Sequence, residues 1–347
     1  MSFELRRSIA PKSSVNPSGE NAAKESLPAA EDRLGFPLVL LICDSNPFSI
    51  VRYFEHALYE CVNLVTVYLD VHEWFLKRFG LPRLLYKLFK TRLRHLGPLP
   101  REPDVVLVVE PYVKTRLELD RFKDSVKVFY ALDPHSPKAR EAYARCGVWG
   151  YDYVFCGQKD YIPMLEELGC SRVHWLPYAV DPSIFRKLED VGVKYDVAFL
   201  GSLTPDRRTV LERLGSRFKL LTVGHGKGAC YMHDASIAYS MSRIVLQVSN
   251  RGTLGARVFE GMACNRLVVA DKIDNGLNDL FVDGRDIVLY GELEELEERV
   301  DYYLSHEEER KRIAVQGYNI VIDKHTYKHR ITELLTTVLG SSLSGGP

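Results

Sequence analysis

Short apolar runs alternate with amphipathic stretches along most of the chain. In the first half the apolar runs are continuous rather than alternating, which is typical of parallel strands that are covered on both faces. The expected strands are residues 36–43, 64–70, 105–110, 126–132, 153–156 and 173–177. Helical patterns fall between them, at 50–61, 73–95, 115–123, 137–146 and 159–168. This alternation, with short connections, predicts a doubly wound α/β sheet.

The same pattern starts again after residue 192. Strands are expected at 195–200, 218–223, 244–248, 267–270 and 287–290, and helices at 206–215, 233–241, 256–263, 292–304, 307–319 and 325–338. The sequence therefore predicts an α/β protein of two Rossmann-like, doubly wound domains that face each other across a cleft. Ligands of such sheets bind at the carboxyl ends of the strands, so the cleft is the expected site.

The expected organisation follows from these patterns. Residues 35–178 form the N-terminal Rossmann-like domain, 179–192 the linker, 193–322 the C-terminal Rossmann-like domain and 323–339 a C-terminal helix. Residues 1–34 and 340–347 are polar and lack periodicity, so a disordered leader and tail are expected. The first apolar run is too short to span a bilayer, and no signal peptide is visible.

Charge and cysteine content add two expectations. Lysine plus arginine equals aspartate plus glutamate, 46 each, so net charge provides no general attraction to nucleic acid or to an anionic membrane. The seven cysteines are scattered and contain no Cys-x-x-Cys pair, which favours reduced thiols over disulfides or a metal site. A cytoplasmic protein is therefore expected.

The segment 252–269 carries the most chemistry. Small residues at Gly255 and Ala256 begin a predicted helix whose exposed N–H groups are suited to bind phosphate. Arg257 lies in the first turn and is placed to pair with the same phosphates, and Glu260, one turn later, is placed to accept hydrogen bonds from ribose hydroxyls. Val258 and Phe259 of this segment, and Asn250 just before it, are also assigned to the ligand. The alternative is a plain helix–strand corner of the core.

A second phosphate candidate follows the predicted strand 195–200. Gly201 and Ser202 end that strand, and Arg207 and Arg208 fall in the first turn of the next helix. The helix dipole favours acids at that end, so the two arginines need another reason, and stabilisation of a diphosphate leaving group is one. The alternative is a pair of solvated surface arginines.

In the N-terminal half, polar residues end the predicted strand 126–132. Asp133 and His135 lie where a doubly wound sheet displays catalytic groups, and both are candidate catalytic residues suited to proton transfer with a bound ligand. The alternative for His135 is a structural role in the turn. After the first strand, residues 44–47 contain no glycine, so the fingerprint of a nicotinamide dehydrogenase is missing.

Two further features concern metal and membrane. The chain contains no Asp-x-Asp, the carboxylate pair by which metal-dependent transferases hold Mg²⁺ or Mn²⁺, so no metal ligand is assigned. Residues 83–94 are basic and amphipathic, with Arg83, Lys87, Lys90 and Arg94 at helical spacing. Such a helix is suited to peripheral contact with an anionic membrane or to an anionic acceptor. The alternative is an ordinary helix of the fold with a solvated basic face.

At these residues a family resemblance becomes clear. Segment 252–269 resembles the donor site of family 4 retaining glycosyltransferases, whose pattern reads E-G-F-G-x-P-x-x-E-A-M-A-x-G-x-P-V-V. The strand ending in Gly201-Ser202, followed by Arg207-Arg208, is more similar to the CgeB-like (spore maturation protein) branch, and segment 175–185 is similar to the linker motif of the superfamily. The resemblance covers residues 150–335. Gly252 stands where the family has its first glutamate, and Asn265 replaces a glycine.

The resemblance implies a GT-B glycosyltransferase that moves a sugar from a nucleotide-diphosphate sugar to an acceptor. It also implies a retaining, metal-independent reaction without a cofactor, with the donor in the C-terminal domain and the acceptor (a glycan, lipid, protein or small molecule) on the N-terminal domain. Arg207 or Arg208, together with Arg257 and the helix start at Gly255–Ala256, would stabilise the departing diphosphate. The alternatives are an epimerase or phosphorylase on the same fold, or a non-catalytic nucleotide-sugar-binding relative, which the change at Gly252 favours. Zero net charge argues against nucleic acid as a partner.

Overall fold

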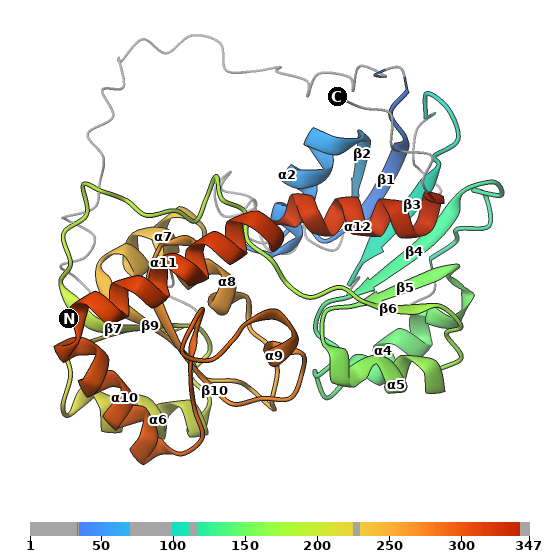
Figure 1. The fold of residues 1–347 in the computed structure, drawn as a ribbon. Coiled ribbons are helices and arrows are strands. Elements are labelled where there is room, and N and C mark those ends of the chain that lie inside the picture. Colours follow the sequence, from blue (N-terminus) through green and yellow to red (C-terminus); the bar gives the residue numbers. More distant parts are fainter. Residues whose placement is uncertain (1–32, 34, 70–98, 111–116, 225–229, 341–347) are drawn as a thin grey trace, which may run out of the picture.

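The structure is a computed structural model that describes residues 33, 35–69, 99–110, 117–224 and 230–340 of the 347-residue chain (Figure 1). The predicted helix 73–95, with its basic segment 83–94, lies outside these residues, as do residues 1–32 of the predicted leader and 341–347 of the predicted tail. Within the described part, no helix combines the length and apolar character needed to cross a lipid bilayer.

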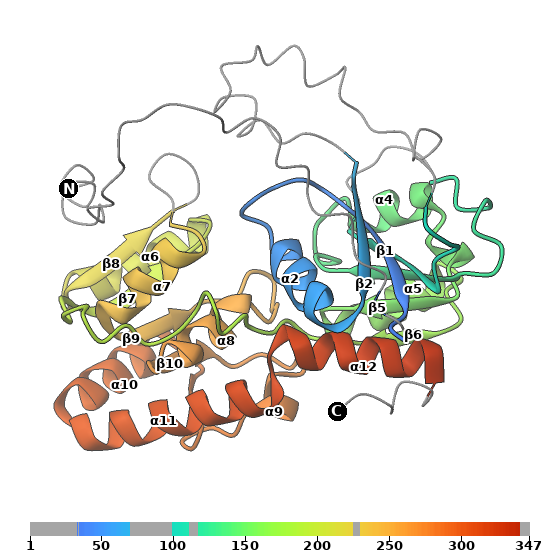
Figure 2. The same ribbon diagram turned by 90° about the horizontal axis from the view of Figure 1, so that it is seen from above.

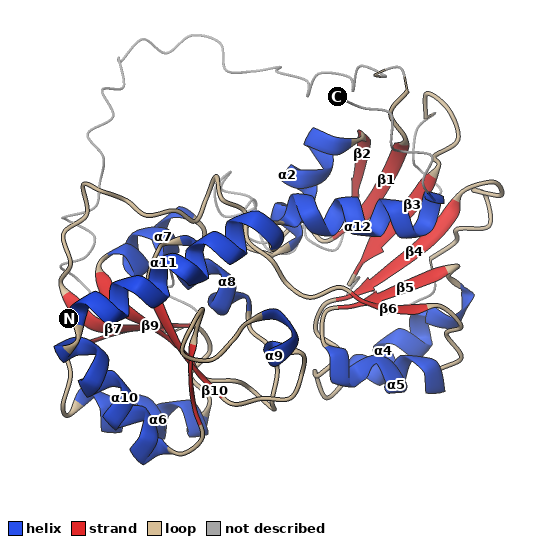
Figure 3. Ribbon diagram, viewed as in Figure 1, coloured by secondary structure: helices blue, strands red, loops and turns tan. Residues whose placement is uncertain are grey.

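The N-terminal sheet is parallel throughout, with strand order β2-β1-β3-β4-β5-β6. Its strands are β1 (Leu38–Cys43), β2 (Asn63–Tyr68), β3 (Val105–Val109), β4 (Val126–Ala131), β5 (Tyr153–Cys156) and β6 (Val173–Trp175). Its helices are α2 (Val51–Cys61), α4 (Ala139–Cys146) and α5 (Ile162–Glu167). Every residue of β1 and β3 is buried, because helices cover both faces of the sheet (Figure 3). Val39 and Leu41 share a core with α2, and Leu40 and Ile42 share another with α4.

The C-terminal sheet is also parallel, with order β11-β10-β9-β7-β8. Its strands are β7 (Tyr195–Leu200), β8 (Leu220–Val223), β9 (Ser242–Gln247), β10 (Leu267–Asp271) and β11 (Val288–Tyr290). The helices are α6 (Pro205–Gly215), α7 (His233–Ser240), α8 (Ala256–Ala263), α9 (Leu277–Leu280), α10 (Leu293–Ser305), α11 (Glu307–Lys324) and α12 (Tyr327–Leu339). The strands of the two sheets fall within the two predicted domain ranges.

Both sheets use one winding order. In each, the second strand lies on one side of the first and the third strand lies on the other side. The winding direction therefore reverses between β1 and β3 and again between β7 and β9. Doubly wound sheets bind ligands at the carboxyl ends of the strands at such a reversal. The topology alone therefore predicts a ligand site at one point of each sheet.

One predicted helix is wrong. Of the predicted helix 115–123, residues 117–123 are described and form a tight turn, in which the Leu119 N–H bonds to the Leu117 carbonyl and the Phe122 N–H to the Leu119 carbonyl. Leu119 and Phe122 are buried under the sheet, so their apolar spacing reflects two anchor points in a short connection to β4. The spacing of two anchors cannot be told from helical periodicity over so few residues.

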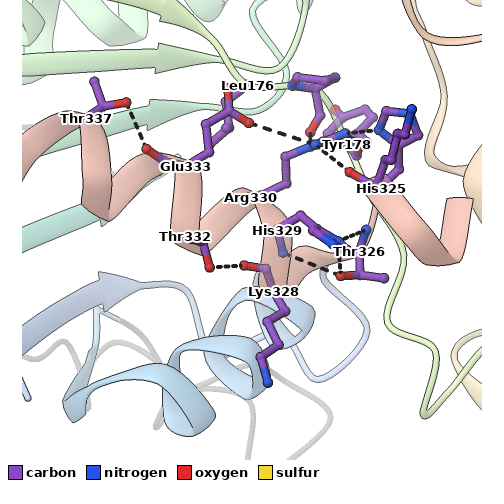
Figure 4. Close-up of polar contacts among 12 residues, drawn as sticks. Leu176, Tyr178, His325, Thr326, Lys328, His329, Arg330, Thr332, Glu333 and Thr337 are labelled. Carbon is purple, nitrogen blue, oxygen red and sulfur yellow. Dashed lines mark hydrogen bonds and ion pairs between the residues drawn. The ribbon is translucent and has the colours of Figure 1, made fainter. Parts of the chain in front are cut away.

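The last helix leaves the C-terminal domain and packs on α2 of the N-terminal domain (Figures 1 and 2). Thr326 and His329 form a capping box at its start. The buried Arg330 donates to the carbonyls of Pro177, at 2.9 Å, and Tyr178, at 3.4 Å, and to Nδ1 of His325, at 2.8 Å (Figure 4).

The two chain segments that pass between the domains are joined to each other here. The Val180 N–H bonds to the His325 carbonyl and the Tyr327 N–H bonds to the Val180 carbonyl, each at 3.0 Å. Residues 177–180 and 325–330 therefore form one connection between the two domains.

Candidate active site

The two winding reversals open on one cavity of about 440 Å³ between the domains. From the N-terminal sheet, Asp44 follows β1 and Glu110 follows β3; from the C-terminal sheet, Gly201 follows β7 and Gln247 ends β9. All four line the cavity. The cavity therefore lies where the topology places a ligand site on both sheets.

The start of α8 forms part of the cavity wall. Gly255 is the N-cap, with an extended backbone and no side-chain cap, so the first N–H groups of the helix receive no bond from a capping side chain. A Cβ at Gly255 would lie 2.8 Å from Oε1 of Gln247, so a larger residue would displace that amide. Gly255 and Ala256 both line the cavity. The predicted phosphate-binding helix start is thus in contact with the cavity.

Arg207 and Arg257 lie side by side on the cavity wall, on the ring of Phe199, with guanidinium carbons 5.4 and 4.4 Å from the ring centroid. Arg207 is buried and donates to the Val248 carbonyl from Nε and Nη2 and to Ser202 from Nη1. Arg257 donates from Nε to the Leu200 carbonyl at 2.6 Å. Burial and then the charge of Arg257 lower the pKa of Arg207 to about 10.

Neither arginine forms a salt bridge within the described residues. Arg207 is buried and Arg257 is half-buried, and the nearby acids, Asp271 and Glu260, attract them without forming a salt bridge. Two adjacent cations of this kind are costly to keep in a low-dielectric cavity. An anionic ligand that contacts both would offset this cost. The charge distribution of the cavity therefore favours a phosphate group.

Of the donor-site candidates that follow β7, only some reach the cavity. Gly201 lines the cavity with φ of +150°, and a Cβ there would overlap the Arg257 guanidinium, so glycine is required. Ser202 contributes its carbonyl and hydroxyl to Arg207. Arg208, in contrast, is exposed, bonds from Nε to the Leu203 carbonyl at 3.1 Å and does not line the cavity. The structure brings only the first arginine of the pair to the site.

The candidate residues of α8 also differ in whether they reach the cavity. Glu260 lines the cavity and accepts a bond of 3.1 Å from the Tyr239 hydroxyl. Burial raises its pKa to about 7, against the opposing effect of Arg257. Val258 and Phe259 are fully buried in the core, where Phe259 packs against Phe281.

Asn250 does not line the cavity, and its carbonyl accepts two bonds from Thr253. With Val258 and Phe259, it belongs to the assigned residues whose side chains the structure does not bring to the cavity.

On the opposite wall, Asp133 lines the cavity and its Oδ1 accepts a bond of 2.9 Å from the Tyr178 hydroxyl. His135 is half-buried and does not line the cavity; its ring lies 6.5 Å from that of Tyr161, edge to face. Burial lowers the pKa of His135. Its carbonyl accepts a bond from Arg251 of the other domain. Asp133 is therefore the one of the two placed to meet a ligand.

The sequence analysis missed Glu110. This carboxylate is buried, follows β3 with φ of +32°, and lines the cavity. Its Oε2 accepts bonds from the N–H groups of Leu132 and Asp133 and from the Tyr143 hydroxyl, at 2.7, 3.1 and 2.6 Å. It thus holds the turn that carries Asp133. An acid directly after a wholly apolar strand was the available signal.

Glu110 should make the protein less stable as pH rises. Burial, and then Asp133, raise its pKa from 4.5 to about 7, so the folded state binds the proton more tightly than the unfolded state. The resulting stability is complete below pH 4.5 and is lost as pH rises to about 7, by up to about 3 kcal/mol at about 1.36 kcal/mol per pKa unit. Urea unfolding of wild type and Glu110→Gln between pH 5 and 8 measures this. An equally steep fall in the variant would contradict the assignment.

No group of three potential metal-ligating side chains occurs among the described residues. All seven cysteines are free thiols in the described part of the chain, five of them buried.

The comparisons with known proteins agree with this geometry. Residues 197–336 match the family model described as glycosyl transferase-like. No curated protein sequence matches this chain significantly. Among solved structures, Anabaena HepE in complex with UDP-glucose is 14% identical, with a TM-score of 0.61 over 87% of this chain and 100% of that one.

Two further solved structures cover 88% of this chain and 100% of their own. Sucrose-phosphate synthase from Thermosynechococcus elongatus is 10% identical with a TM-score of 0.54, and a glycosyltransferase from Rickettsia africae is 11% identical with a TM-score of 0.57.

The chain has the GT-B fold. The prediction of two Rossmann-like domains across a cleft is thereby confirmed. The family model covers the half of the GT-B architecture that carries α8, Arg207 and Arg257. Residues 197–336 accordingly form a glycosyl transferase-like domain on this fold, which supports an enzyme of the glycosyltransferase class.

Proposed function

We propose that this enzyme transfers a sugar from a nucleoside-diphosphate sugar to an acceptor that binds on the N-terminal domain. The observation that carries the proposal is the arginine pair, Arg207 and Arg257, which lines the cavity beside the uncapped start of α8 and has no salt bridge among the described residues. A diphosphate would offset both charges. Arginines at a helix N-terminus are an established way to bind one.

The chemistry follows from which wall each group occupies. When the bond between the sugar and the diphosphate breaks, negative charge grows on the leaving oxygen, where Arg207 and Arg257 stabilise it. Glu260 accepts hydrogen bonds from the ribose. Asp133, on the facing wall, contacts the sugar or receives the proton of the acceptor hydroxyl.

The finer parts of the proposal rest on the sequence resemblance of residues 252–269. These are retention of configuration at the sugar carbon and kinship with the CgeB-like branch. Because HepE was crystallised with UDP-glucose, a UDP-sugar is the first donor to test.

A thermal-shift screen against nucleoside diphosphates and their sugars tests the donor. A ligand at a hundred times its dissociation constant adds about 2.7 kcal/mol of stability, which displaces the melting curve measurably. The proposal fails if no nucleoside diphosphate stabilises the protein. Donor binding without turnover across a broad acceptor panel would instead support a non-catalytic relative, the reading favoured by Gly252.

We expect transfer to continue without divalent metal. The cavity can neutralise a diphosphate through Arg207, Arg257 and the helix start, so a metal has no required role there. The rate in excess EDTA should equal the rate in Mg²⁺ within about twofold, far from the several kcal/mol that a catalytic metal supplies. Loss of activity in EDTA that Mn²⁺ or Mg²⁺ restores would refute this expectation.

A further inference from the structure

A fully buried glutamine joins the two domains next to the proposed donor site. Gln158 follows β5 of the N-terminal domain and has no exposed surface. Its side-chain amide bonds twice to Leu254 of the C-terminal domain: Nε2 donates to the Leu254 carbonyl and Oε1 accepts from the Leu254 N–H, each at 3.0 Å. The amide therefore pairs with this backbone as a neighbouring strand would. None of the chemistry proposed above uses Gln158.

Asn275 completes the arrangement from the loop after β10. Its Nδ2 donates to Oε1 of Gln158 at 2.6 Å and to the Gly252 carbonyl at 3.2 Å, and its Oδ1 accepts from the N–H of Asp160 at 3.0 Å. Asn275 is also buried. The side-chain amides of Gln158 and Asn275 thus form a satisfied buried network, which is favourable only while both remain in place.

The backbone held by this pair leads directly into α8. We call residues 250–255 the donor loop. Arg251 and Gly252 of the loop have φ values of +58° and +68°, and a non-glycine residue in that region needs support from its surroundings. Thr253 and Gly255 line the cavity, and Gly255 is the N-cap of α8. A shift at Leu254 would therefore be passed on to the start of α8.

We propose that Gln158 and Asn275 are positioning residues that hold the donor loop so that α8 and Arg257 meet the donor diphosphate. The inference rests on the proposed function and adds that contact with the N-terminal domain sets donor affinity. Arg251, which donates to the His135 carbonyl at 3.2 Å, supports the same loop from a second point. Neither positioning residue lines the cavity.

The first experiment needs no ligand. Hydrogen exchange of the Leu254 amide, whose acceptor is Oε1 of Gln158, reports the contact directly. In Gln158→Ala this amide should exchange at least about tenfold faster than in wild type, while the amides of β7 and β9 are unchanged. Leu165→Ala, a buried change whose side chain packs in the core of the N-terminal domain, is the matched control for general destabilisation. Equal exchange of Leu254 in Gln158→Ala and wild type would overturn the inference.

The second experiment uses UDP as the probe. Gln158→Ala should weaken UDP binding about tenfold, because the two neutral hydrogen bonds that hold Leu254 are lost, and Leu165→Ala should leave it unchanged. Equal weakening in both variants would show that only stability matters, and it would overturn the proposal. If wild type binds no nucleoside diphosphate, the proposed function fails, and the exchange result alone decides whether the pair positions the loop.

A conservative variant gives the sharpest test. In Gln158→Glu, a protonated carboxyl can still donate to the Leu254 carbonyl and accept from its N–H, whereas the ionised form offers only acceptors. We expect the ratio of the UDP affinity of this variant to that of wild type, measured at the same pH, to be close to one at low pH and to fall as pH rises. A ratio that does not change with pH would contradict a role for the amide donor.

Discussion

Replacing Arg207 or Arg257 with methionine is expected to lower kcat/KM for sugar transfer by at least about 100-fold, the usual effect of removing one donor to transition-state charge. Both guanidinium groups line the cavity, and neither has an ion-pair partner among the described residues. Methionine keeps an apolar side chain against Phe199, so the packing changes less than the charge. The measurement is steady-state kinetics with the donor found in the thermal-shift screen.

The chain contains its own control for this prediction. Arg208 is adjacent to Arg207 but exposed and outside the cavity. Arg208→Met should therefore keep kcat/KM within about threefold of wild type, since exposed charges contribute little. Because Arg207 also bonds to the Val248 carbonyl, its variant needs a melting curve to show that it is folded. A loss in Arg208→Met as large as in Arg207→Met would mean that the cavity is not the donor site.

Removing the carboxylate of Glu260 is expected to weaken donor binding by about 1.5–3 kcal/mol, the range for a hydrogen bond to a charged group. Glu260 lines the cavity one turn after the start of α8. Its pKa of about 7 adds a pH dependence: the carboxylate fraction, and with it the affinity for the ribose, should increase as pH rises from 6 to 8. Calorimetric titration of UDP into wild type, Glu260→Ala and Glu260→Gln measures both effects.

The ribose contact itself can be isolated with deoxynucleotides. UDP lacking a ribose hydroxyl should bind wild type more weakly than UDP, and the difference should disappear in Glu260→Ala, because the two changes remove the same bond. Glu260→Gln keeps an acceptor for the Tyr239 hydroxyl and should lose the pH dependence while remaining folded. Unchanged UDP affinity in folded Glu260→Ala would show that Glu260 does not bind the ribose.

The amino-acid sequence by itself determined the layers of the fold. Strands that are buried on both faces must be apolar without alternation, and the sequences of β1 and β3 are continuously apolar. The start of α8 could also be predicted from the sequence, because small residues at the beginning of a helix leave its first N–H groups accessible to a ligand. Constraints of this kind act between residues that are close in the chain, so they can be predicted from a single sequence.

Only the tertiary structure decided which side chains meet. Arg207 and Arg208 are equivalent in sequence, but successive residues of a helix point about 100° apart, so the packing of α6 buries one and exposes the other. Asp133 and His135 divide in the same way at the end of β4. The contacts of Glu110 with Asp133, and of Gln158 with Leu254, join residues 23 and 96 positions apart. Such pairs exist only once the sheets are wound and the domains are docked, which no local pattern encodes.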